Sequence, residues 1–253
     1  MPIETVSFDV LGVHVSAVNM AQALALIDQW IADRARQYVC VTGVHGVMES
    51  RRDPELCDIH NRAGLVTPDG MPLVWLGRLA GRRHVGRVYG PDLLAALCEH
   101  SLAAGRRHFF YGGSERALAL LREVLERRYP GLQVAGMIAP PFRPLTPAEE
   151  ADMVAAINAA RPDIVWVGLG TPKQERWMAA HVERLKASVL IGVGAAFDFH
   201  AGLKPQAPRW MQRAGLEWLF RLATEPRRLW RRYLINNPLF IAALVREWLA
   251  RRR

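Results

Sequence analysis

The stretch Ile164-Val-Trp-Val-Gly-Leu-Gly-Thr-Pro172 decides the fold: a short apolar strand that ends in a glycine-rich turn before a helical pattern. Strand-like runs of the same kind recur at residues 108–111, 133–137 and 189–192. Amphipathic helical patterns separate them at residues 115–128, 147–160 and 172–185. Near-continuous apolar strands that alternate with amphipathic helices predict an α/β fold, with a parallel sheet covered by helices on both faces.

The first hundred residues repeat the alternation less regularly. The pattern predicts a strand pair over 6–15, strands at 38–42 and 65–67, and helices at 20–36, 45–63 and 71–79. Tyr89-Gly-Pro-Asp92 opens a further helix, because Pro91 suits a first turn and Asp92 complements the positive helix end. Four prolines within residues 139–147 predict an extended loop, and the last 50 residues predict helix throughout.

Charge is distributed unevenly along the 253 residues. Twelve of the 33 lysines and arginines lie after residue 200, against three of the 24 acidic residues, so this segment carries the whole net charge of +9. It also holds Trp210, Trp218, Trp230 and Trp248, half of all the tryptophans. Arginine and tryptophan at helical spacing favour an anionic membrane surface over a solvated basic helix pair. No nucleic-acid motif accompanies the charge, so nucleic acid is not an expected partner.

Several functional classes are excluded by what the sequence lacks. No apolar run reaches the roughly 20 residues that a spanning helix needs, and residues 1–5 carry no secretory signal. Cys40, Cys57 and Cys98 show no CxxC or Cys/His spacing, which predicts thiols in a reducing cytoplasm and no zinc site. GxGxxG, GxxxxGK[ST], HExxH and GxSxG are all missing, so no cofactor or metal is expected.

Three predicted strands end in glycine, at Tyr111-Gly-Gly-Ser114, Val167-Gly-Leu-Gly-Thr-Pro172 and Ile191-Gly-Val-Gly194. Glycine lets a backbone approach a phosphate closely, and the helix that follows offers free N–H groups. Because the carboxyl ends of parallel strands share one edge, we expect a nucleotide at this edge, held by Gly112, Gly113, Gly168 and Gly170. Each glycine taken alone is equally consistent with a tight turn.

Several blocks together resemble one family. They are Thr67-Pro-Asp-Gly-Met71, Arg87-Val-Tyr-Gly-Pro-Asp92, Phe110-Tyr-Gly-Gly113, Val167-Gly-Leu-Gly-Thr-Pro-Lys-Gln-Glu175, Gly194-Ala-Ala-Phe-Asp198, Gly215-Leu-Glu-Trp-Leu-Phe-Arg221 and Glu225-Pro-Arg-Arg228. This set, which extends over nearly the whole chain, resembles the WecG/TagA/CpsF family of bacterial glycosyltransferases.

The resemblance implies a Rossmann-like core with an α-helical C-terminal appendage. We expect a core over 1–204, divided into an N-lobe to about residue 88 and a nucleotide-binding lobe over about 89–204, and a basic, Trp-rich membrane-associating appendage over 205–253. The implied activity is a metal-independent, inverting transfer of a sugar from a UDP-sugar to a polyprenyl-pyrophosphate-linked saccharide in cell-surface polysaccharide synthesis. The protein would be peripheral, on the cytoplasmic face of the inner membrane, and its apolar tail also allows a homo-oligomer.

The resemblance also assigns roles to single residues. Asp69 matches the family's proposed catalytic base, although Asp-Gly is also an ordinary turn signal. Gln174, Thr42 and Arg87 match family active-site residues. Val44 and Gln206 depart from the family pattern, in which Asn and Arg are common at these positions. The substrate of a relative therefore cannot be assigned to this protein.

No DxD motif supplies ligands for a divalent ion on the diphosphate, so arginine is expected to offset its charge. Arg221, Arg228 and Arg231 match appendage arginines that close over the nucleotide; the alternatives are contacts to anionic lipid, or ion pairs with Glu217 and Glu225. Asp198 is expected near the nucleotide, with a capping or ion-pair role as the alternative. A non-enzymatic membrane-surface module that binds a nucleotide sugar is the competing hypothesis, and it needs neither Asp69 nor Gln174.

Overall fold

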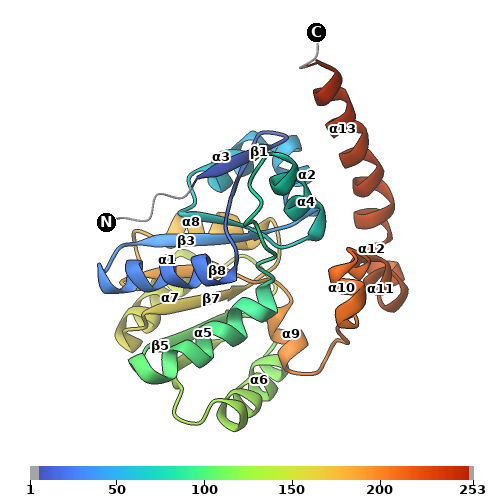
Figure 1. Cartoon of the computed structure of the whole chain (residues 1–253). Helices are drawn as coiled ribbons and strands as arrows, with labels where there is room; N and C mark the ends of the chain where they lie inside the picture. Colours follow the sequence, from blue (N-terminus) through green and yellow to red (C-terminus); the bar gives the residue numbers. More distant parts are fainter. Residues whose placement is uncertain (1–5, 251–253) are drawn as a thin grey trace.

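The computed structural model describes residues 6–250, so the ends of the predicted core and appendage at 1–5 and 251–253 lie outside the described residues. Figure 1 shows an α/β core beside a separate arm of helices that contains the C-terminus. The predicted fold class is confirmed: a parallel sheet carries helices on both faces, and the chain ends in helices.

The sheet contains six parallel strands in the order β4-β3-β8-β7-β5-β6. They are β3 (Gln37–Thr42), β4 (Leu65–Pro68), β5 (Arg107–Gly112), β6 (Gln133–Ile138), β7 (Ile164–Gly168) and β8 (Val189–Gly192). All four residues of β8 and the first four of β7 are buried, which explains why these central strands are continuously apolar. The parallel register places the carboxyl ends of all six strands at one edge.

Two apolar layers cover the sheet. One packs α1 (Met20–Ala32), α5 (Gly90–Ala104), α6 (Glu115–Arg128) and α9 (Ala196–His200) on one face. The other packs α2 (Val44–Arg52), α4 (Met71–Leu79), α7 (Pro147–Ala160) and α8 (Lys173–His181) on the opposite face. Because α6 follows β5 on one face and α8 follows β7 on the other, the loops after these neighbouring strands diverge and leave a crevice between them.

The N-terminal hairpin joins β1 (Ser7–Val10) to β2 (Val13–Ser16) and packs beside β4, where the Val66 N–H donates to Ser16 Oγ at 3.0 Å. The helix predicted over 45–63 is in fact two, α2 and α3 (Pro54–Asn61). Asp53 separates them, because a residue before proline avoids helical angles, and its carboxylate caps α3 at the Leu56 N–H, 3.1 Å away.

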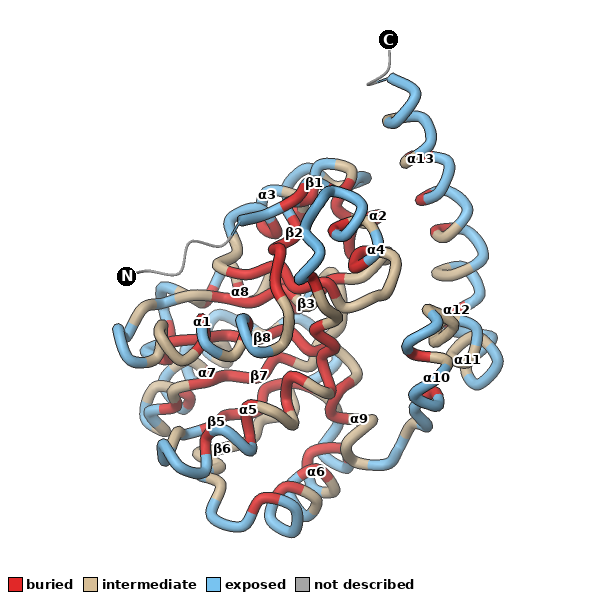
Figure 2. Tube along the Cα trace, viewed as in Figure 1, coloured by how far each residue is buried: buried red, intermediate tan, exposed pale blue. Residues whose placement is uncertain are grey.

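The C-terminal arm consists of α10 (Arg209–Arg213), α11 (Glu217–Thr224), α12 (Pro226–Trp230), a π-helical turn η1 (Arg231–Ile235) and α13 (Asn236–Ala250). Figure 2 shows that exposed residues dominate α13, with a few buried ones along it. Those buried residues are Asn236, Phe240 and Ala243. Within residues 6–250 there is no helix long and apolar enough to cross a membrane.

Candidate active site

Two cavities open at the carboxyl edge of the sheet. The first, here called the charged cavity, has a volume of about 560 Å³ and is walled on one side by the core and on the other by the C-terminal helices. The core side contributes the turn after β4 and the start of α2. The polar residues that line it are His45, Asp69, Arg87, Gln212, Glu217, Arg221, Arg232, Tyr233 and Asn237.

Asp69 lies in the turn between β4 and α4, where its N–H donates to the Thr42 carbonyl at 3.0 Å. Its carboxylate faces the charged cavity, and Oδ1 is buried with no hydrogen-bond partner. Burial raises the pKa of Asp69 to about 6; the charge of Glu217 adds to the rise, whereas the guanidiniums of Arg87 and Arg221 oppose it. Asp69 is therefore a carboxylate poised to accept a proton near neutral pH.

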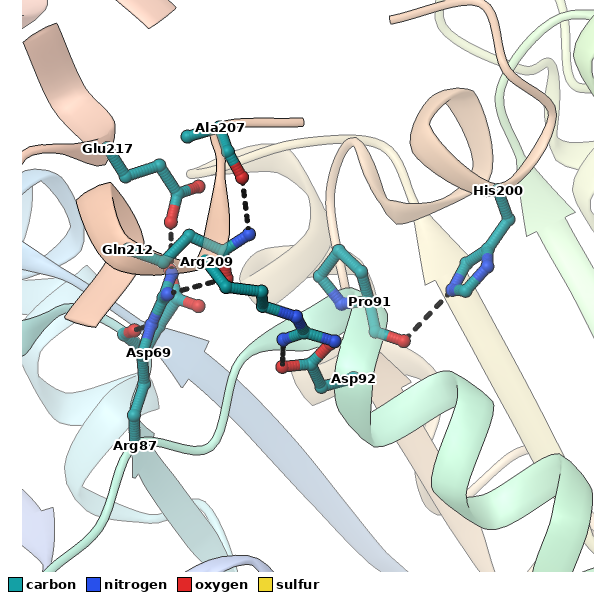
Figure 3. Close-up of polar contacts among 9 residues, drawn as sticks. All are labelled: Asp69, Arg87, Pro91, Asp92, His200, Ala207, Arg209, Gln212 and Glu217. Atoms are coloured by element: carbon teal, nitrogen blue, oxygen red, sulfur yellow. Dashed lines mark hydrogen bonds and ion pairs between the residues drawn. The ribbon is translucent and has the colours of Figure 1, made fainter. Parts of the chain in front are cut away.

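Arg87 joins the core to the C-terminal helices (Figure 3). Its Nε donates to the backbone carbonyl of Asp69, its Nη1 to Gln212 Oε1 at 3.3 Å, and its Nη2 to the Glu217 carboxylate. The Arg87 and Glu217 side chains are both largely buried, so the ion pair is shielded from water. The guanidinium of Arg87 is therefore hydrogen-bonded to protein groups, and these bonds hold α10 and α11 over the Asp69 turn.

The predicted appendage arginines separate in the structure. Arg221 lines the charged cavity, whereas Arg228 lines the second cavity, where it pairs with Glu225 at 2.6 Å. Arg231 is exposed and lies over the ring of Trp230, outside both cavities. Its neighbour Arg232 lines the charged cavity instead. Sequence reasoning missed Arg232, because adjacent helical residues point about 100° apart and the π-helical turn changes the phase.

The start of α13 is anchored on α2 by polar contacts. Arg52 Nη2 donates to Asn236 Oδ1 at 2.7 Å, and Asn236 Nδ2 lies 3.3 Å from His45 Nδ1. Burial lowers the pKa of His45 to about 3, and the nearby charges of Arg232, Arg52 and Arg221 act in the same direction. His45 is therefore neutral at physiological pH and adds no charge to the cavity.

The second cavity, here called the glycine-edge cavity, has a volume of about 620 Å³ and lies in the crevice between the loops after β5 and β7. Gly113, Gly168, Gly170 and Asp198, which the sequence analysis assigns to nucleotide binding, line it together with residues 140–145 of the proline-rich loop. Gly112 lies just behind the lining, where a Cβ would come within 2.6 Å of the Gly168 backbone. The close approach of the ends of β5 and β7 therefore requires glycine at residue 112, independently of any ligand.

A chain of ion pairs joins three residues that line the glycine-edge cavity, Asp198, Lys204 and Arg228, through Glu225. Lys204 Nζ lies 2.6 Å from Asp198 and 3.7 Å from Glu225, which in turn pairs with Arg228. Asp198 thus has the ion-pair partner that the sequence left open, and it also lines the cavity. These contacts connect α9 of the core to α12 of the arm.

Thr42 and Gln174 line neither cavity and act through the backbone. Thr42 Oγ1 lies 3.0 Å from His60 Nε2, and its carbonyl accepts from the Asp69 N–H. Gln174 is buried; its Oε1 accepts from the Gly194 N–H at 2.9 Å and its Nε2 donates to Glu175 at 3.0 Å. The Thr42 carbonyl thus holds the Asp69 turn, and the Gln174 side chain holds the end of β8.

A row of rings and guanidiniums separates the two cavities. The Arg87 Cζ lies 4.1 Å from the Tyr89 ring centroid, Tyr89 lies 6.4 Å from Phe199, and the Arg221 Cζ lies 5.5 Å from Phe199. Phe199 directly follows Asp198 of the glycine-edge cavity, so this row of contacts links residues that line the two cavities. This arrangement suits transfer of a group between two bound substrates.

Comparison with known proteins agrees with the geometry. Residues 8–253 match the model of the glycosyl transferase WecG/TagA/CpsF family. An N-acetylglucosaminyldiphosphoundecaprenol N-acetyl-beta-D-mannosaminyltransferase of Bacillus spizizenii is 30% identical over 199 residues, which cover 79% of this chain and 75% of that protein. Proteins of the same name from Bacillus subtilis (28% identity, 78% of this chain and 74% of that one) and Staphylococcus aureus (23%, 94% and 91%) are also similar.

The fold, the paired cavities and these matches define the class: the protein is a glycosyltransferase built on an open parallel α/β sheet. The chain belongs to the glycosyl transferase WecG/TagA/CpsF family.

Proposed function

We propose that the protein transfers a sugar from a UDP-sugar, held in the glycine-edge cavity, to a polyprenyl-pyrophosphate-linked saccharide held in the charged cavity. One observation carries the proposal: Asp69, whose Oδ1 has no hydrogen-bond partner, lines a cavity at the carboxyl edge of the sheet, where a glycine-lined crevice also opens. The names of the relatives support the acceptor class, because each specifies a sugar carried on a diphosphoundecaprenol.

In the proposed reaction, the Asp69 carboxylate takes the proton of an acceptor hydroxyl while the hydroxyl oxygen attacks the anomeric carbon of the donor. The bond from this carbon to the diphosphate breaks on the opposite face, so the anomeric configuration inverts. UDP leaves with the bonding electron pair. Lys204 and Arg228, on the rim of the glycine-edge cavity, offset the charge that grows on the diphosphate, so the reaction needs no metal ion.

The apolar face of the arm suits a position on the membrane. Exposed apolar side chains run along the C-terminal helices: Trp230, Leu234, Ile235, Leu239, Ile241, Val245, Trp248 and Leu249. Leu79, on the core side of the charged cavity, is 84% exposed. We propose that this surface rests on the cytoplasmic face of the bacterial inner membrane, as a peripheral protein in cell-surface polysaccharide synthesis, and brings the charged cavity to its lipid-linked acceptor.

The direct test is UDP release from a panel of UDP-sugars with a synthetic prenyl-pyrophosphate saccharide. We expect acceptor-dependent release by the wild-type protein and a loss of about 10³-fold or more in Asp69→Asn. Asp58→Asn, on an exposed ion pair of α3, is the matched control and should retain full activity. Release that Asp69→Asn leaves unchanged would remove Asp69 from the mechanism, and no release with any donor would favour a non-enzymatic nucleotide-sugar module.

A further inference from the structure

Two arginines of the charged cavity have no carboxylate partner. Arg87 is paired with Glu217, but no described acidic side chain lies within 4.0 Å of Arg221 or Arg232. The Nε atoms of both are buried and lack a hydrogen-bond partner in the described part of the chain. Each unsatisfied guanidinium group in a protein interior costs free energy, so two together indicate that a ligand completes the site.

The surroundings of Arg232 increase its need for an anion. Burial lowers the pKa of Arg232 from its ordinary value, and the charges of Arg221 and Arg228 contribute, although Tyr233 and Asp69 oppose them. On the core wall beside it, His45 is neutral, and Asp69 supplies the opposing carboxylate charge. Arg232 is therefore under-compensated, whereas for Arg221 burial is outweighed by the charges of Tyr233 and Glu217, which raise its pKa. A ligand with two or more negative charges beside both guanidiniums would compensate Arg232.

The same cavity continues into an apolar section. Its lining there comes from α4 on one side and α13 on the other, through Trp75, Leu76, Leu79, Ile241 and Leu244. Leu79 and Ile241 are both exposed where the section meets the surface. A ligand that fills the whole cavity thus has a strongly anionic head and an apolar chain.

We propose that Arg221 and Arg232 form a subsite for the diphosphate of the lipid-linked acceptor, whose prenyl chain leaves along Trp75, Leu79 and Ile241. The proposal rests on the proposed function for the identity of the acceptor. The donor diphosphate has its own cations, because Lys173, Lys204 and Arg228 line the glycine-edge cavity. The two diphosphates are thereby held apart, one on each side of Phe199.

Adjacent residues supply a matched pair of variants. Arg232→Gln removes a guanidinium from the cavity, and Arg231→Gln removes the exposed one next to it on the same turn. We expect Arg232→Gln to raise the KM for the acceptor by about 10- to 100-fold and to leave the KM for the UDP-sugar within about twofold. Arg231→Gln should change neither constant. Because Arg232 is under-compensated, Arg232→Gln should fold with an unchanged or higher Tm.

A binding measurement separates this proposal from the proposed function. Farnesyl diphosphate and UDP are titrated separately into each variant, with inorganic diphosphate as a third probe. We expect Arg232→Gln to weaken farnesyl diphosphate binding by at least about tenfold while UDP binding is kept. Equal losses for UDP, or equal effects of Arg231→Gln, would overturn the subsite. Selective loss of farnesyl diphosphate in a protein that transfers no sugar would support the subsite and reject the transferase reaction.

Discussion

Arg87 binds the main chain of Asp69 and makes no hydrogen bond to its carboxylate. The Nε of Arg87 donates to the Asp69 carbonyl oxygen, whereas Oδ1 of the same aspartate has no hydrogen-bond partner. The arginine therefore positions the carboxylate and lowers its pKa through space, without occupying a carboxylate oxygen. The position of the Asp69 carboxylate and the attachment of the C-terminal helices therefore both depend on the side chain of Arg87.

This dual role predicts the effect of Arg87→Lys. A lysine cannot reach the Asp69 carbonyl, Gln212 and Glu217 at once, so at least one of these buried acceptors loses its donor. We expect the free energy of unfolding to fall by about 1–3 kcal/mol and kcat to fall by about tenfold or more. Urea unfolding and steady-state kinetics measure both. Arg209→Lys, on the exposed pair with Asp92 that also joins the arm to the core, is the control and should be nearly neutral; similar losses in the two variants would refute this role.

The raised pKa of Asp69 predicts opposite pH effects on activity and stability. As a base the group must be ionised, so kcat/KM should fall as the pH drops through about 6. Asp69 binds its proton more tightly in the folded state than in the unfolded chain. Its contribution to the free energy of unfolding is therefore complete below about pH 4 and is lost as the pH rises through 6. Asp69→Asn should therefore raise the unfolding free energy at pH 7.5 by about 1–3 kcal/mol. A variant less stable than wild type would contradict the assigned environment.

Alanine substitutions at Gly112 and Gly131 compare a glycine in close contact with another strand end and a glycine with open space around it. Both have positive φ, 116° and 91°, but an added Cβ at Gly112 meets the Gly168 backbone at 2.6 Å, whereas nothing lies within 4 Å at Gly131. We expect Gly131→Ala to cost about 1 kcal/mol and Gly112→Ala to cost about 2–4 kcal/mol. Thermal unfolding compares them, and equal costs would show that backbone conformation alone requires glycine at residue 112.

The apolar face of the arm predicts vesicle binding that depends on α13. Leu239→Ser with Trp248→Ser removes two exposed side chains without touching the buried Phe240. We expect cosedimentation with phosphatidylglycerol vesicles to weaken by about tenfold or more, because less apolar surface enters the lipid. Leu102→Ser, an exposed leucine on α5, controls for surface polarity in general. Undiminished sedimentation of the double variant would place the lipid contact elsewhere.

The proposed charge compensation by arginine and lysine predicts that EDTA leaves the initial rate within about twofold of the untreated rate. Among residues 6–250, no group of three or more His, Cys, Asp or Glu is placed to hold a metal ion. UDP release is followed before and after chelation, with Mg²⁺ and Mn²⁺ added back in turn. A strict requirement for either ion would overturn the metal-independent mechanism.

The regular part of the fold could be predicted from the sequence because its strands are buried on both faces. Residues 164–168 and 189–192 are strands at the predicted bounds, since an apolar run between a helix end and a glycine leaves little freedom. Helix ends were less accurate. Two separate helices at 44–61 depend on Asp53-Pro54, a short local signal within a longer helical pattern.

The site was only partly predictable, because it depends on helix phase and on hydrogen bonds between distant residues. Asp69 and the glycines follow strand ends, whose common edge the topology fixes. Whether Arg231 or Arg232 faces inward depends on a π-helical turn, and no feature of the sequence specifies it. The partners of Gln174, including the Gly194 N–H, likewise appear only when β8 and α8 are in place.

The C-terminal helices supply Gln212, Glu217, Arg221 and Arg232 to the charged cavity and Arg228 to the glycine-edge cavity. One segment thus completes the walls of both sites. Any displacement of the arm from the core would open both at once, so occupancy of either site is coupled to the other through the seating of these helices.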